Sequence, residues 1–128
     1  MKFEMKEDVG FKVDLAYGEL HVAGDEDYGF RPFQLMVSSI AVCSGGVLRK
    51  ILAKQRVEIT NMTIEADVER NEEEANRIEK IHIHFLISGK DLKEEKLRKA
   101  VELSSKNCPM VQSVKGSIEI KETFAIVD

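Results

Sequence analysis

RPFQLMVSSIAVCSGGVLRKILAK, residues 31–54, is the most informative segment of this chain. Pro32 suits the first turn of a helix, where its missing N–H costs no hydrogen bond. Apolar residues then recur every three or four positions, which is typical of a helix. They are Phe33, Met36, Val37, Ile40, Ala41, Val47, Leu48, Ile51 and Leu52. The spacing predicts one helix of roughly 22 residues that lies buried at the centre of the protein.

Segments of alternating apolar residues on both sides of this helix predict strands. The predicted strands occupy residues 2–22 in short pieces, 57–68, 78–88 and 117–127. Two further helices are predicted at residues 91–105 and 110–115. The order indicates an α+β fold whose strands pack around the long central helix. No repeat or linker divides the chain, so we expect residues 1–128 to form a single domain.

The glycine pair inside the predicted helix needs a structural reason. Gly45 and Gly46 should each cost about 1 kcal/mol relative to alanine in a helix interior. A kink in the helix, or another backbone passing close to it, would supply that reason.

The bulk composition excludes several classes of partner. The 128 residues are 43% hydrophobic and 33% charged, with a formal net charge of −4, and this gives no basic field for nucleic acid. The first ten residues, MKFEMKEDVG, lack the apolar core of a signal peptide. The apolar run of residues 35–48 is interrupted by serines and glycines and is shorter than the roughly 20 residues that span a bilayer. We therefore expect a cytoplasmic protein without membrane or nucleic-acid partners.

The chemistry is expected at the two cysteines, Cys43 and Cys108. Each can be a core residue, a reactive thiol or half of a redox pair. Pro109 places Cys108 at or next to the N-cap of a helix, where the helix dipole favours a thiolate. Two thiols without a CxxC motif do not have the pattern of a metal site. His82 and His84 lie on one face of a strand, but a metal site would need a third or fourth ligand beside them. We predict no metal and no cofactor.

The arrangement of these residues resembles that of the OsmC/Ohr family. The matching features are residues 31–36 (RPFQLM) before Cys43, the eleven-residue spacing from Pro32 to Cys43, and the later Cys108-Pro109 at a helix start. The resemblance extends over roughly residues 30–127, and the order of elements agrees with the family. It implies two intertwined subunits, a homodimer, with the long helices at the centre and the thiols near the interface.

The resemblance also implies the reduction of small organic hydroperoxides in oxidative-stress defence. Carried over by position, Cys43 is the peroxidatic thiol and Cys108 is the resolving thiol, and an external dithiol reduces the resulting disulfide. The family supports the peroxidatic thiol with an early Arg and a Glu at the helix start. Here the first arginine is Arg31, and Gln34 follows Phe33 at the helix start, so Arg31 and Gln34 are the supporting candidates.

Two other functions are compatible with the same residues. The first is a non-catalytic small-molecule-binding or stress protein of the same fold that has lost peroxidase activity. The second is a protein with a purely structural or partner-binding role, in which both cysteines fill the core. Reactivity of the thiols toward hydroperoxides distinguishes these alternatives from the peroxidase.

Overall fold

The computed structural model describes all 128 residues. In chain order the elements are β1 (Phe3–Met5), β2 (Phe11–Asp14), β3 (Glu19–Val22), α1 (Pro32–Lys54), β4 (Ile59–Asn71), β5 (Arg77–Gly89), α2 (Glu94–Asn107), α3 (Pro109–Val114) and β6 (Glu119–Ile126). The α+β class and the long helix are as predicted. The chain divides into two compact units, Met1–Ser38 and Ser39–Asp128, and α1 begins in the first and continues through the second.

The first unit is built on a three-stranded antiparallel sheet in the order β1-β2-β3. Val13 in β2 pairs with Phe3 of β1 and Leu20 of β3, and its side chain is buried. Gly29 lies against the backbone of His21, where an added Cβ would sit 2.8 Å from the His21 carbonyl oxygen. The short strands predicted for residues 2–22 are confirmed.

The second unit contains a separate sheet in the order β4-β5-β6. Strands β4 and β5 form the predicted antiparallel hairpin, and β6 lies parallel to β5 after a crossover through α2 and α3. The hairpin is longer than predicted at its turn, because Asn71 pairs with Arg77 in the ladder. The side chains of both residues donate hydrogen bonds to the Glu79 carboxylate, at 2.8 and 2.9 Å.

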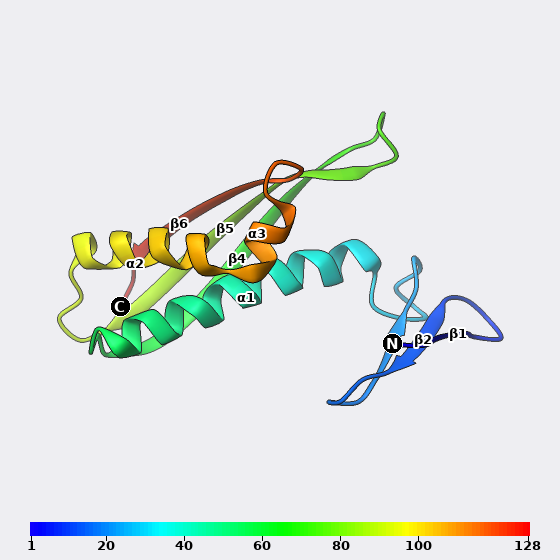
Figure 1. Cartoon of the computed structure of the whole chain (residues 1–128), viewed down its shortest axis with the longest axis horizontal. Coiled ribbons are helices and arrows are strands. Elements are labelled where there is room, and N and C mark those ends of the chain that lie inside the picture. The colour runs from blue at the N-terminus through cyan, green and yellow to red at the C-terminus, as the bar shows by residue number, and fades with distance from the viewer. The chain divides into compact units, whose positions relative to one another are not determined.

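The core of the second unit lies on one face of this sheet. The central strand β5 contributes four side chains with no exposed surface, which are Ile81, Ile83, Phe85 and Ile87. From the helices, α1 contributes Leu48 and Leu52, and α2 contributes Leu97, Ala100 and Val101. Figure 1 shows α2, α3 and the later part of α1 running along the β4–β6 sheet. This layer of helices holds both cysteines.

The two neighbouring glycines of α1 have different surroundings. A Cβ added at Gly45 would lie 2.4 Å from Ile64 Cδ1 of β4, so the helix packs closely on the sheet at this point. The predicted approach of a second backbone is therefore not found at Gly45, where the close neighbours are the side chains of Ile64 and Phe85. A Cβ added at Gly46 would meet nothing within 4 Å. Within one chain, therefore, packing explains why glycine is present at position 45 but does not explain the glycine at position 46.

Helix α1 is long and apolar enough, by length and composition alone, to cross a membrane. Residues 35–48 alone are too short to span a bilayer, but the apolar pattern continues to Lys54 and the full helix is long enough. A core helix passes the same test, and Ile40, Leu48 and Leu52 are buried in the second unit. One face of α1 is thus part of a protein core.

Candidate thiol site

Cys43 lies near the middle of α1, in the second unit, and is half-buried. Its neighbours along the chain differ in exposure: Val42 is exposed, whereas Ser44 and Gly45 are buried. The buried side of the helix faces the β4–β6 sheet, as the contact at Gly45 shows. Cys43 therefore sits at the border between the buried and the open side of α1.

Cys108 occupies the N-cap of α3, with Pro109 in the first turn, as the sequence predicted. Its backbone is extended, with φ −79° and ψ 114°, so the chain turns here from α2 into α3. The backbone N–H of Val111 donates a hydrogen bond to Cys108 Sγ at 3.5 Å. The side chain is fully buried. A thiol thus takes the place that serine or aspartate usually has at a helix start.

The structure brings the two thiols together. The Cys43 side chain lies close enough to Cys108 to shift its pKa, and neither cysteine forms a disulfide. Burial raises the pKa of Cys108, and the Cys43 side chain adds to this effect. The N–H groups of Val111 and Met110 act in the opposite direction but do not outweigh burial. The N-cap N–H groups thus lower the pKa of Cys108, as expected for this position, but burial outweighs them.

Next to the thiols lies a carboxyl group that the sequence reasoning missed, that of Glu122 on β6. Glu122 pairs with Ile83 of β5, whose side chain is buried under the helices, so it too points toward the helix layer. The Ser44 hydroxyl donates a hydrogen bond to Glu122 Oε1. The alternation in β6 could have pointed to this residue, because Glu122 lies on the same strand face as the apolar residues Ile120 and Phe124.

The two supporting candidates lie in the first unit. The Arg31 guanidinium stacks on the ring of Phe33, 4.7 Å from its centroid. Gln34 is exposed in the first turn of α1. The thiol pair belongs to the second unit, so the roles of Arg31 and Gln34 at that site stay predictions.

The histidines of β5 lie on the opposite side of the sheet from the helices. His82 Nε2 and His84 Nδ1 are 2.7 and 2.6 Å from the Thr123 hydroxyl oxygen. One hydroxyl can donate a hydrogen bond to one imidazole and accept one from the other. His82 and His84 are half-buried and both hydrogen-bond to Thr123, so their position is explained by contacts within the protein.

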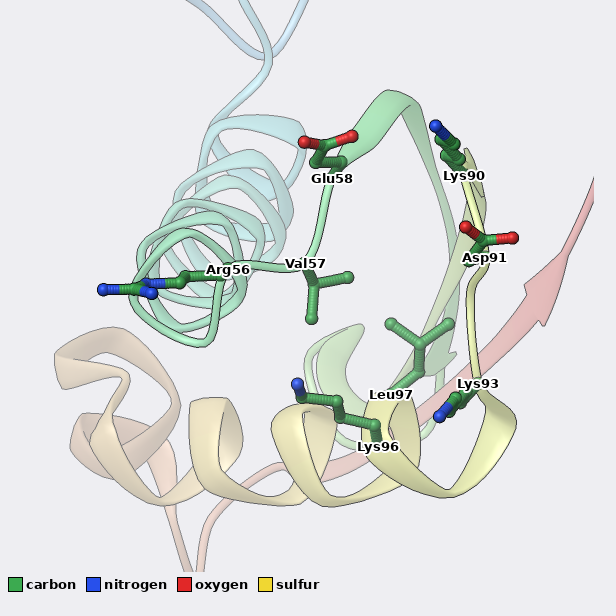
Figure 2. Close-up of a pocket in the computed structure, with 8 residues that line it drawn as sticks. All are labelled: Arg56, Val57, Glu58, Lys90, Asp91, Lys93, Lys96 and Leu97. Atoms are coloured by element: carbon green, nitrogen blue, oxygen red, sulfur yellow. The ribbon is translucent and has the colours of Figure 1, made fainter.

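A separate cavity of about 400 Å³ lies between the end of α1 and the start of α2. In Figure 2 the side chains of Val57 and Leu97 point into it, Lys96 lies at its edge and Arg56 points away. Its charged residues are exposed. Because Cys108 follows the other end of α2, this cavity is not part of the thiol site.

The fold and the site define a small α+β protein with two neighbouring thiols in the layer of helices that covers one face of the sheet. The model of the OsmC-like protein family matches residues 24–123. A relative in Bacillus subtilis (strain 168), the organic hydroperoxide resistance protein OhrB, is 30% identical over 93 residues, which cover 73% of this chain and 68% of OhrB. The chain belongs to the OsmC-like family.

Solved structures agree with this assignment. A hypothetical protein from Aquifex aeolicus VF5 matches with a TM-score of 0.88 and 28% identity, covering 98% of this chain and 93% of that one. An OsmC-like protein from Mycoplasma pneumoniae matches with a TM-score of 0.87 over 99% of this chain and 95% of its own. At 16% identity, the second match shows the fold alone.

Proposed function

We propose that this protein reduces small organic hydroperoxides with Cys43 as the peroxidatic thiol and Cys108 as the resolving thiol. The observation that carries the proposal is the contact between the two thiols, which lie 65 positions apart in the sequence (108 − 43 = 65) and meet without a disulfide. The family assignment and the printed name of the Bacillus subtilis relative support a role in peroxide stress.

The proposed reaction has two steps on the protein. The Cys43 thiolate attacks the distal peroxide oxygen and breaks the O–O bond, which gives a sulfenic acid on Cys43 and, after one proton is taken up, an alcohol. The Cys108 sulfur then attacks the Cys43 sulfenic acid, which forms the disulfide and releases water. An external dithiol supplies two electrons and two protons to restore both thiols. No metal or cofactor is required.

Arg31 and Gln34 are proposed as supporting groups for this chemistry. A guanidinium within reach of Cys43 would stabilise its thiolate and polarise the peroxide. The Gln34 amide can donate and accept hydrogen bonds, so it can orient such an arginine, although it cannot hold it by charge. We place the reaction in the cytoplasm, where thiols are kept reduced.

We also propose that the working form is a homodimer. On α1, Val42 is 66% exposed and Gly46 has open space around it. The two residues are four positions apart and share one side of the helix. An exposed apolar stripe on a central helix is stabilised when a second copy covers it. Several exposed apolar residues of the first unit, among them Phe3, Met5 and Phe11, support the same conclusion.

The experiment that tests the function is a turnover assay with cumene hydroperoxide and a dithiol such as dithiothreitol. The wild-type chain should consume the peroxide, and Cys43→Ser should abolish this activity. Persistence of both free thiols under excess hydroperoxide would contradict the proposal. That result would favour the alternative, a non-catalytic binding or stress protein of the same fold, which has no specific support from the residues around the thiols.

A further inference from the structure

Glu122 is a carboxyl group on the helix-covered face of the sheet that the proposed reaction does not use. Its ladder partner is Ile83, and its neighbours on the same face of β6 are Ile120 and Phe124. Positions on such a covered face are usually occupied by apolar residues. The presence of Glu122 there therefore calls for a role.

The carboxyl group connects the segments that carry the two thiols. The Ser44 hydroxyl, from the residue after Cys43, donates to Glu122 Oε1. The Ser105 hydroxyl, near the end of α2 and three residues before Cys108, lies close enough to the carboxyl group to lower its pKa. Glu122 thus lies between the segments of α1 and α2 that carry the two thiols.

The second carboxyl oxygen, Oε2, is inaccessible to solvent and has no hydrogen-bond partner. Burial raises the pKa of Glu122, while the hydroxyls of Ser44 and Ser105 lower it by a smaller amount. No charged side chain from α1, α2 or β5 contributes to this shift. A carboxylate here would place charge on a buried oxygen without a donor, which is the physical cause of the raised pKa.

We infer that Glu122 is a positioning residue, whose carboxyl group holds α1 to β6 through the Ser44 hydroxyl, beside Ser105 of α2, and so sets the spacing of Cys43 and Cys108. The inference rests on the proposed function of the two thiols as a redox pair. Ionisation of Glu122 favours entry of water at Oε2 and separation of the helices. The two sulfurs then meet less often. As the pH rises, the rate of disulfide formation therefore increases less than the growing fraction of thiolate alone would predict.

The test uses diamide, a diazene that accepts two hydrogens from a thiol pair, so that no peroxide has to be recognised. The rate of Cys43–Cys108 disulfide formation is measured from pH 5 to 8 in wild type and in Glu122→Gln, whose neutral side chain cannot ionise. At low pH the two rates should agree. As Glu122 ionises, the variant should become faster than wild type by roughly two- to tenfold, the effect of one hydrogen bond.

A matched control is Glu119→Gln, an exposed position on the same strand, which should follow wild type at every pH. A rate ratio between Glu122→Gln and wild type that is independent of pH would overturn the positioning role. A chain that shows the predicted ratio with diamide but does not react with cumene hydroperoxide would overturn the peroxidase proposal and leave the role of Glu122 intact. Glu122→Gln preserves size and hydrogen bonding, so its folding is expected to be native.

Discussion

At the residue scale, the surroundings of the two thiols are consistent with the different roles that we propose for them. Cys43 is half-buried at the border of the open side of α1. Cys108 is fully buried and its pKa is raised by that burial, which disfavours its thiolate. In the proposed reaction, Cys43 therefore reacts first and its sulfenic acid forms next to Cys108.

Removal of Cys108 should therefore stop the reaction after its first step. In Cys108→Ser, one equivalent of organic hydroperoxide should convert Cys43 to a sulfenic acid that has no resolving partner. Trapping with dimedone followed by mass spectrometry should find a stable adduct on Cys43. In Cys43→Ser, the matched control, Cys108 should remain a free thiol. An adduct on Cys108 in that control would reverse the assignment.

The stability of the fold should depend on pH through Glu122. Its pKa in the folded protein is raised above the ordinary value of 4.5, so the stability it contributes is complete below pH 4.5 and is lost as the pH rises through the raised pKa. Glu122→Gln does not titrate. Relative to wild type, its free energy of unfolding should increase above pH 4.5 by the order of 1 kcal/mol and then level off.

Urea unfolding of wild type and Glu122→Gln between pH 4 and 8 measures this difference. Glu119→Gln serves as the exposed control on the same strand. A constant difference between Glu122→Gln and wild type across this range would show that Glu122 titrates normally in the folded state.

At the element scale, the fit of α1 against the β4–β6 sheet depends on the missing side chain at Gly45. Gly45→Ala would bring its Cβ within 2.4 Å of Ile64 Cδ1. We expect a loss of up to about 2 kcal/mol in the free energy of unfolding, because the cost of overpacking is partly offset by the roughly 1 kcal/mol that alanine gains over glycine in a helix interior. Ile64→Val removes the clashing atom. The double variant should therefore lose less stability than the sum of the two single variants, and strict additivity in urea unfolding would contradict this packing.

The sequence predicted most elements of the second unit because their hydrophobic periods are clear. In the helix predicted at residues 91–105, Leu97, Ala100, Val101 and Ser104 have the spacing of one helix face, and all four are buried. The N-cap position of Cys108 followed from Pro109 alone. Local signals of this kind depend on neighbours in the sequence, so they can be recognised without a structure.

The parts of the site that depend on distant segments could not be predicted in this way. The spacing of residues 31–54 does not mark out Ser44, yet it is buried and bonded to Glu122, 78 residues away. The contact between Cys43 and Cys108 was implied only by the family resemblance. The net pKa of Cys108 could not be predicted, because the effect of a helix start is local whereas burial depends on tertiary packing.

At the scale of the whole molecule, the proposed homodimer can be tested on the exposed side of α1. Val42→Asp places a charge where we expect a second copy to pack, so it should convert a dimer into monomers. Thr63→Asp, at an exposed position of β4 on the other face of the sheet, should leave the dimer intact. Light scattering after size-exclusion chromatography measures both. A wild-type chain that is monomeric at micromolar concentration would contradict the dimer.

The measurement that tests the account most directly is peptide mapping of the fully reduced wild-type chain after one equivalent of cumene hydroperoxide. The chain has two cysteines, so a disulfide within one chain can join only Cys43 to Cys108. We predict that the peptides containing these residues are recovered as one cross-linked species under non-reducing conditions, with two hydrogens lost per chain. Recovery of both peptides as free thiols, or with Cys43 oxidised to sulfinic acid and Cys108 unchanged, would contradict the central claim that the two thiols act as a pair.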